Sequence, residues 1–166
     1  MGLHDVTTMN SIRTALDNLY ADGSGSQILM YGEAWDMATN CDEGTVLASQ
    51  KNLKQLSDRI GAFDDTIRDA IKGSTGGTDG AFVQEGSRRA NLKTGIAGQS
   101  DTTTGWANVP SQCVTYASCH DNLCLYDKLV GSVYGADGKY RKRYEDLVAM
   151  NLSLIHISEP TRLQLI

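Results

Sequence analysis

The 166-residue sequence lacks the basic clusters that nucleic-acid-binding proteins carry. It contains 15 Lys and Arg against 20 Asp and Glu, a formal charge of −5, and its densest basic stretch is the short segment 139–143. This balance provides no positive surface of the size that a phosphate backbone requires. We therefore expect no nucleic-acid partner.

Long apolar runs are also missing. No uninterrupted apolar stretch approaches the roughly 20 residues that a membrane-spanning helix needs. The first residues, Met1 to Asp5, lack the basic and apolar regions of a signal peptide. We therefore expect no membrane partner. The compartment stays undetermined, and the sequence leans only weakly towards the cytoplasm.

Cysteine is sparse, and its spacing does not match a zinc site. The four cysteines, Cys41, Cys113, Cys119 and Cys124, include no pair with the C-x2-C spacing of zinc ligands. We expect reduced thiols that pack as small hydrophobic groups. With 40% hydrophobic and 21% charged residues, the composition is that of a globular domain or part of one.

Short apolar runs alternate with segments of helical periodicity, which predicts an α/β fold with a parallel sheet. Gly73 ends the helix that carries Ile67 and Ala70, and either Asp64 or Asp65 caps its start. Loops are expected over 74–80 and 98–112. Strands are predicted at 27–31, 59–63 and 113–118, and the first of these is expected to be buried on both faces. Besides the helix that ends at Gly73, helices are predicted at 6–20, 48–57 and 87–97. A last helix is marked by Tyr140, Tyr144, Leu147 and Val148.

Polar clusters follow the first and third predicted strands, where parallel sheets place their active sites. Glu33 lies beside Trp35 and Asp36, so a carboxyl group adjoins a large apolar ring, a setting that can favour a general acid. An exposed loop glutamate is the alternative. The segment 120–122, His-Asp-Asn, suits sugar hydroxyls, but it could instead cap a helix that begins near Leu123.

Three segments in register, together with a fourth at residues 1–10, resemble the type I pullulanases, the debranching members of the α-amylase superfamily. Residues 31–36, Y-G-E-A-W-D, are similar to the family's Y-G-E-G-W-D, and residues 120–129 are similar to H-D-N-x-T-L-W-D-K-L. Residues 59–73 resemble a third pullulanase segment, and residues 1–10 resemble the sequence after the family's F-D-L-M-G. Ala34, Cys124 and Tyr126 replace the family's Gly, Thr and Trp, which affects the fine fit of the substrate rather than the reaction class.

The resemblance implies a fold and a domain organisation. Residues 1–151 would be a partial (β/α)8 TIM barrel covering about strands 5 to 7 with flanking helices, since a complete barrel takes around 250 residues. Such a piece should be marginally stable alone. Residues 152–166 resemble a translated sequencing adapter, so we exclude them from the fold.

The resemblance also implies roles for particular residues in a retaining glycoside hydrolase that cleaves α-1,6-glucosidic branch links of an α-glucan. Glu33 would be the general acid/base and Asp121 the transition-state stabiliser. The nucleophilic Asp of F-D-L-M-G would lie two residues before Met1, so this chain alone should be inactive. The implied substrate-binding residues are Trp35, His120, Asn122, Tyr31 and Asp36.

The sequence leaves other functions open. The parent protein could be another enzyme of the superfamily, such as an isoamylase or a branching enzyme. It could also be a catalytically silent α-glucan-binding protein that retains Trp35 and His120 as sugar contacts. The chemistry needs no metal or organic cofactor. Calcium occurs in the wider superfamily, but the sequence shows no ligand cluster that would place it.

Overall fold

The structure, a computed structural model, describes residues 1–37, 40–133, 145–146 and 148–152. Within them the chain forms two compact units. Unit 1 comprises Met1–Asp64 and Thr94–Thr115, and unit 2 comprises Asp65–Lys93 and the described residues from Tyr116 onward. The elements in chain order are α1 (Val6–Asp17), η1 (Ser24–Gln27), β1 (Met30–Gly32), η2 (Gln50–Gln55), β2 (Ile60–Phe63), α2 (Asp65–Lys72), α3 (Phe82–Glu85), α4 (Arg89–Ile96), η3 (Pro110–Gln112), β3 (Cys113–Val114) and α5 (Leu125–Val133), where η marks a 3-10 turn.

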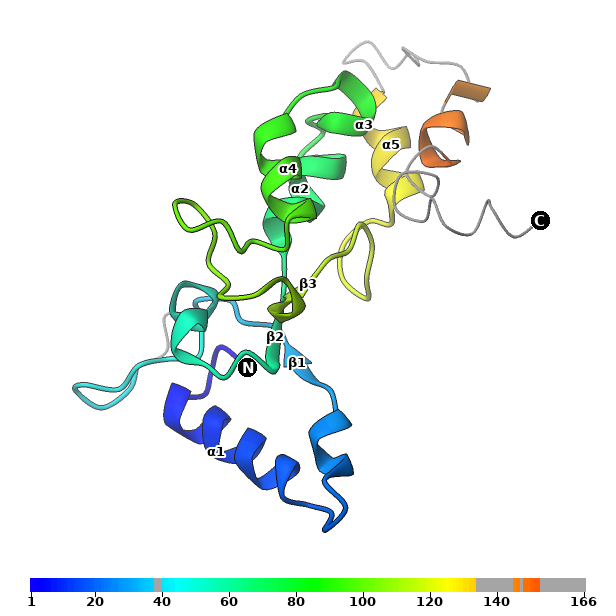
Figure 1. The fold of residues 1–166 in the computed structure, drawn as a ribbon. Helices are drawn as coiled ribbons and strands as arrows, with labels where there is room; N and C mark the ends of the chain where they lie inside the picture. The colour runs from blue at the N-terminus through cyan, green and yellow to red at the C-terminus, as the bar shows by residue number, and fades with distance from the viewer. Residues whose placement is uncertain (38–39, 134–144, 147, 153–166) are drawn as a thin grey trace. The chain divides into compact units, whose positions relative to one another are not determined.

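Unit 1 is built on a parallel three-stranded sheet in the order β1-β2-β3 (Figure 1). Met30 of β1 lies opposite Ile60 of β2, and Ala62 of β2 lies opposite Cys113 of β3. The predicted α/β class with parallel strands is therefore confirmed. The third strand is shorter than the predicted 113–118, because pairing with β2 ends at Val114.

The prediction for the first strand is wrong in its extent and its burial. The strand begins at Met30 rather than at residue 27, because residues 24–27 form η1. It was expected to be buried on both faces, yet Tyr31 is 57% exposed and the preceding Leu29 is 83% exposed. Since β1 is an edge strand of the described sheet, its side chains have a strand neighbour on one side only.

Helix α1 begins where Asp5 caps it, because the Thr8 backbone N–H donates to Asp5 Oδ1 at 2.8 Å. It ends at Asp17, three residues before the predicted end. Met9 is buried as expected, but Ile12 is 43% exposed, so the predicted apolar stripe is only partly correct.

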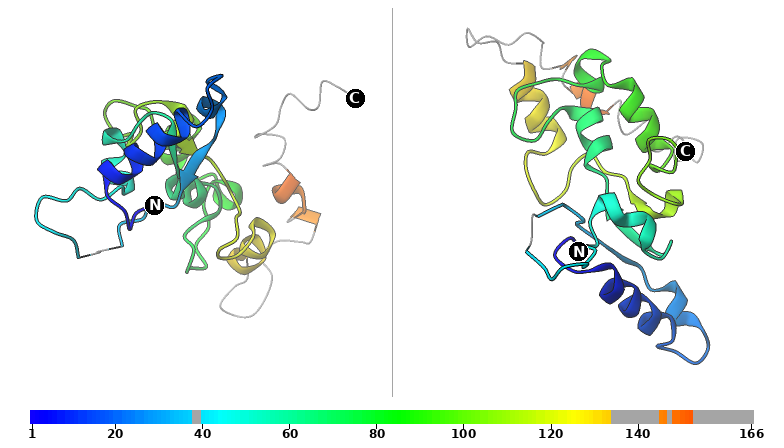
Figure 2. Two further views of the ribbon diagram at one scale, coloured as in Figure 1. Left: turned by 90° about the horizontal axis from the view of Figure 1, so that it is seen from below. Right: turned by 90° about the vertical axis from the view of Figure 1, so that its left-hand side faces the viewer.

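A buried arginine connects α1 to the segment that leads into β1. Arg13 is 1% exposed, and its guanidinium donates to the carbonyls of Ile28 at 2.6 Å and Gly25 at 3.0 Å. It also pairs with Asp17 at 2.7 Å. These bonds hold α1 alongside η1, as Figures 1 and 2 show. The polar contacts of Arg13 therefore provide part of the attachment of α1 that the apolar stripe was expected to provide.

The core of unit 1 is one apolar cluster on the α1 side of β2. The predicted helix 48–57 is instead the 3-10 turn η2 flanked by extended residues, and it contributes Leu53 to this cluster. The buried members are Met9, Ala34, Ala48, Leu53, Leu56, Ile60, Ala62 and Ala107.

Unit 2 is helical. The helix predicted to end at Gly73 is α2, and Gly73 adopts φ +95°, the left-handed conformation that terminates helices. The predicted helix at 87–97 corresponds to α4. The core of unit 2 contains Ile67, Ile71, Leu125, Leu129 and Val133.

Most of the last predicted helix lies outside the described residues, because Tyr140, Tyr144 and Leu147 are not among them; Val148 lies in the described helical residues 148–152. None of the helices in the described ranges is long and apolar enough to cross a membrane.

Candidate functional site

The backbone that carries Glu33 directly follows β1 and is held by two neighbouring segments. The Gly2 N–H donates to the Glu33 carbonyl at 3.0 Å, and the Gln50 N–H donates to the Ala34 carbonyl at 2.7 Å. Ala34 is completely buried. These two hydrogen bonds hold the backbone of residues 33–34 in place just after β1, where strand pairing has ended.

The side chains after β1 divide by exposure. Glu33 and Asp36 are exposed, whereas Trp35 is half-buried. Asp36 forms an ion pair with Lys51. Tyr31 on β1 contacts Phe63 on β2 edge to face, with ring centroids 5.9 Å apart and an interplanar angle of 72°. The structure thus leaves the Glu33 carboxyl group accessible and covers part of the Trp35 ring.

A second carboxylate follows β2, and it is buried rather than accessible. Asp64 has no exposed surface; its Oδ2 accepts from Gln99 Nε2 at 2.7 Å and from Cys113 Sγ at 3.4 Å. The Asp64 N–H donates to the Val114 carbonyl at 3.1 Å, which extends the pairing of β2 with β3. The sequence suggested Asp64 only as a possible cap for α2. Asp64 directly follows a buried strand, and this position is the signal in the sequence that could have predicted a buried carboxylate that accepts hydrogen bonds.

The segment His120–Asn122 lies in unit 2, on an exposed loop that leads into α5. The Asn122 N–H donates to Asp121 Oδ1 at 2.9 Å, and Asn122 adopts φ +63°. Cys119 Sγ lies 3.2 Å from His120 Nδ1. All three predicted side chains are therefore accessible.

The alternative prediction was that residues 120–122 cap a helix, but another residue caps the first amide of α5. The backbone N–H of Leu125, the first residue of α5, donates to Ser118 Oγ at 2.7 Å. Ser118 thus supplies the acceptor for that helical amide, two residues before His120.

The four cysteines are free thiols, but only Cys113 is partly buried. The expectation that they all pack as hydrophobic groups is wrong, because Cys41, Cys119 and Cys124 lie in exposed segments. Burial, together with the nearby Asp64 carboxylate, raises the pKa of Cys113 to about 12. In the described part of the chain, no group of three or more His, Cys, Asp or Glu side chains could hold a metal ion.

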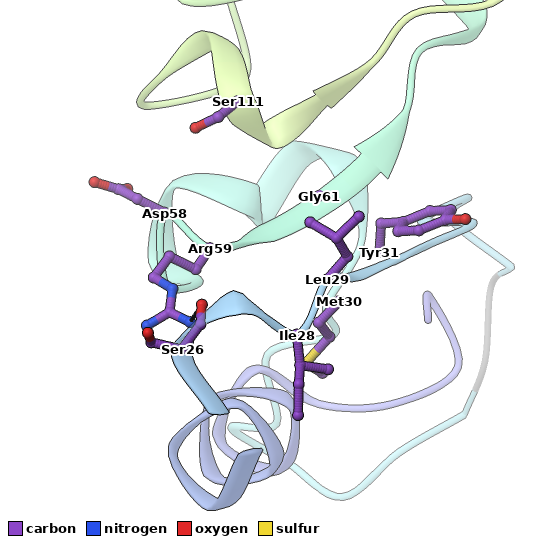
Figure 3. Close-up of a pocket in the computed structure, with 9 residues that line it drawn as sticks. All are labelled: Ser26, Ile28, Leu29, Met30, Tyr31, Asp58, Arg59, Gly61 and Ser111. Carbon is purple, nitrogen blue, oxygen red and sulfur yellow. Dashed lines mark hydrogen bonds between the residues drawn. The ribbon is translucent and has the colours of Figure 1, made fainter. Parts of the chain in front are cut away.

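A shallow hollow of about 200 Å³ lies elsewhere in unit 1, beside the amino-terminal ends of β1 and β2 (Figure 3). Figure 3 shows Arg59 next to Ser26 on one side of it, and Arg59 donates to the Ser26 carbonyl. Tyr31 is the one predicted site residue that lines it. Because parallel sheets place active sites at the carboxyl ends of their strands, this hollow is distinct from the candidate site.

The predicted site residues therefore fall into two groups, and each group lies together within its own unit. Tyr31, Glu33, Trp35 and Asp36 belong to unit 1, and residues 120–122 belong to unit 2. The catalytic roles that the resemblance implies for Glu33 and Asp121 stay predictions.

Comparison with known proteins shows that the chain is similar to pullulanases. It is 34% identical over 112 residues to a pullulanase of Bacillus subtilis strain 168, which covers 61% of this chain and 14% of that protein. It is 27% identical to pullulanase A of Streptococcus pneumoniae serotype 2, over 80% of this chain and 10% of that protein. No protein-family model matches the sequence.

Solved structures show the same similarity. The apo pullulanase of Paenibacillus barengoltzii superimposes with a TM-score of 0.75 at 35% identity, over 90% of this chain and 22% of that one. The type I pullulanase of Bacillus subtilis strain 168, solved with maltose, gives 0.75 at 26% identity, over 90% of this chain and 20% of that one. The chain thus spans less than a quarter of the length of each of these relatives.

Proposed function

The chain is homologous to a segment of the pullulanases, and on that premise we propose that its parent protein is a starch-debranching glycosidase that hydrolyses α-1,6-glucosidic branch links. The single observation that carries the proposal is the agreement in fold and sequence with the Paenibacillus barengoltzii pullulanase over 90% of the chain. That pullulanase has also been solved with maltohexaose and α-cyclodextrin. An α-glucan such as pullulan, amylopectin or glycogen is therefore the proposed substrate.

The proposal includes the architecture around the site. The parallel order β1-β2-β3 is what consecutive strands of a (β/α)8 barrel would adopt. In this proposal residues 1–151 are part of the catalytic barrel, about strands 5 to 7, and residues 152–166 do not belong to it. In this proposal Glu33, which follows β1, and Asp121, in the loop before α5, act on the same α-glucan.

The proposed reaction retains the configuration at the anomeric carbon. A carboxylate nucleophile attacks that carbon while Glu33 donates its proton to the departing glycosidic oxygen, and the covalent glycosyl intermediate forms. Glu33, now ionised, then takes a proton from water, whose oxygen displaces the nucleophile. In retaining enzymes the two carboxyl groups are about 5 Å apart. The nucleophile would be supplied by a residue outside this sequence.

The remaining residues would bind the sugar. Asp121 would stabilise the oxocarbenium-like transition state and accept hydrogen bonds from sugar hydroxyls, and His120 would bind sugar hydroxyls beside it. Trp35 offers a flat apolar surface of the kind on which a sugar ring packs. Tyr31, Asp36 and Asn122 would complete the substrate contacts. The exposure of Glu33, Asp36 and residues 120–122 supports this proposal, because a polymer must reach them.

The decisive experiment uses the complete protein, with the codons that flank this chain restored. Wild type should release products from pullulan, and Glu33→Gln should lower kcat about 100- to 10,000-fold while glucan binding persists, since a general acid contributes that much. Glu43→Gln, which changes another exposed loop glutamate, is the matched control and should retain activity.

The alternatives give different results. Cleavage of amylopectin or glycogen without cleavage of pullulan would indicate an isoamylase-type enzyme, and formation of new branches would indicate a branching enzyme. Glucan binding by wild type without any turnover would contradict an enzymatic role altogether.

A further inference from the structure

We propose that Lys72 is a positioning residue for the reaction: it fixes the loop that presents Asp121 by holding the backbone of that loop at Leu123. The inference rests on the proposed catalytic role of Asp121. It concerns a contact within unit 2, between the end of α2 and the segment before α5.

The contact joins a buried cation to an exposed loop. Lys72 is 1% exposed, and its Nζ donates to the Leu123 carbonyl at 2.6 Å. Leu123 is 47% exposed and lies two residues after Asp121. The backbone of Lys72 is itself held, because its carbonyl accepts a hydrogen bond from Gln84 Nε2 at 2.9 Å. Lys72 can therefore restrain a loop that packing leaves largely free.

The restraint reaches the carboxylate through the next peptide. The Asn122 N–H donates to Asp121 Oδ1, and Asn122 holds a positive φ that few side chains adopt readily. The Leu123 carbonyl that Lys72 binds lies just beyond this turn. At the other end of the segment, Ser118 Oγ holds the amide of Leu125. The loop is thus anchored on both sides of the residue whose orientation matters.

Stability alone does not explain a lysine at position 72. Burial lowers the pKa of Lys72, and the neighbouring Arg68 guanidinium lowers it further. Keeping this lysine charged therefore reduces the stability of the folded protein. An apolar side chain of similar length would fill the space without that cost, as replacements of buried charged groups often show. A charge retained where an apolar group would fit is consistent with a geometric task.

Unit 2 contains a second buried lysine that serves a different loop. Lys128 is also 1% exposed, but its Nζ donates to the carbonyls of Ser74 and Gly77 and lies 3.4 Å from Asp79 Oδ1. None of these partners belongs to residues 118–125. Replacing Lys128 removes the same chemical group from the same unit, which makes it the matched control for Lys72.

The test measures kcat and KM on pullulan for the complete protein with Lys72→Met and with Lys128→Met, each in wild-type and Asp121→Asn backgrounds. Lys72→Met should lower kcat about 10- to 100-fold, since a displacement of about 1 Å can cost that much, while KM changes less than about threefold. In the Asp121→Asn background, the same change should lower kcat by less than about twofold. Lys72→Arg, which keeps a donor, should recover part of the loss.

Lys128→Met should leave kcat per folded molecule unchanged in both backgrounds. The inference is overturned if Lys72→Met and Lys128→Met lower kcat alike, or if Lys72→Met costs as much in the Asp121→Asn background as in wild type. If Lys72→Met does not fold, Lys72→Leu, which also lacks a donor, replaces it with the same expectations.

Hydrogen exchange separates this inference from the proposed function. Lys72→Met should raise amide exchange over residues 119–125 at least tenfold, whereas Lys128→Met should not. An unchanged exchange rate in Lys72→Met overturns the inference whatever the activity. A wild-type protein without glucan hydrolysis overturns the proposed function instead, and an exchange change confined to Lys72→Met would still support the restraint of the loop.

Discussion

The side-chain amide of Gln99 donates a 2.7 Å hydrogen bond to the carboxylate of Asp64, and each side chain is at most 2% exposed. The two residues connect the end of β2 to the loop before β3, both within unit 1. A buried carboxylate is tolerated only when such donors replace the water that it loses. This pair therefore stabilises the carboxyl end of the central strand, next to the segment that carries Glu33.

Removing the donor should destabilise unit 1. Gln99→Met keeps the length of the side chain and leaves the Asp64 carboxylate without this bond, so we expect the free energy of unfolding to fall by about 2 kcal/mol. Urea unfolding of the complete protein measures it. Gln55→Met, at an exposed position, should change that free energy by less than about 0.5 kcal/mol. Equal effects of the two substitutions would contradict a role for the buried pair.

Thiol reactivity should distinguish Cys113 from the other cysteines. The thiolate is the reactive form, and burial beside Asp64 raises the pKa of Cys113 to about 12. At pH 8 its alkylation by iodoacetamide should be at least about tenfold slower than that of Cys41, since each pKa unit changes the thiolate fraction about tenfold. Peptide mapping over a time course measures both rates. Faster labelling of Cys113 than of Cys41 would show that the Cys113 thiol, at the start of β3, is open to solvent.

Asp79 should make unit 2 sensitive to acid. The Ser74 hydroxyl and backbone N–H, together with the Lys128 ammonium, hold the pKa of this carboxyl well below its usual range. Its folded pKa lies below its unfolded value, so its stabilising contribution is present above the ordinary value and is lost as pH falls through the folded value. The pair of Asp79 with Arg88, 2.6 Å apart, weakens in the same pH range.

The corresponding test is Asp79→Asn. Because Asp79 is partly exposed, we expect a loss of about 1 kcal/mol at neutral pH, discounted for solvent screening. The difference between variant and wild type should shrink below about pH 4 as the wild-type carboxylate is protonated. Melting temperatures between pH 2 and 7 measure it, with Asp42→Asn as the control for removal of an exposed loop charge. A difference that grows on acidification would contradict the assignment.

The sequence predicts best those elements whose signals are local. The apolar run at 60–63 is β2, and the helix that Gly73 terminates is α2. Both predictions depend only on residues that are close together in the sequence. Glu33 was placed directly after a strand, and β1 does end at Gly32. These predictions need only the order of apolar and polar residues.

Features that depend on distant neighbours could not be predicted. The exposure of Tyr31 reflects which strands flank β1, and no local pattern encodes that. The buried Arg13 replaces an expected apolar contact because its guanidinium donates hydrogen bonds to carbonyls 12 and 15 residues away. The bond from Lys72 to Leu123 spans 51 residues, so the sequence gives no sign of it.

Gly2 should be essential for the placement of the backbone after β1. A Cβ atom at this position would lie 2.1 Å from the Trp35 carbonyl oxygen, far inside contact distance, and 3.2 Å from the Ala34 carbonyl carbon. Gly2→Ala must therefore displace either its own segment or residues 34–35, and it should weaken the bond from the Gly2 N–H to the Glu33 carbonyl. We expect a loss of about 1–3 kcal/mol in stability, as for other overpacked positions.

Gly131→Ala is the matched control for Gly2→Ala, because a Cβ at Gly131 meets nothing within 4 Å and the residue lies inside α5, where alanine is favoured by up to about 1 kcal/mol. It should leave the melting temperature unchanged or raise it. In the complete protein, Gly2→Ala should also lower kcat on pullulan, because the segment that carries the proposed acid moves, whereas Gly131→Ala should not. A Gly2→Ala protein with wild-type stability and wild-type kcat would show that the close approach of Gly2 to Trp35 does not hold Glu33 in place.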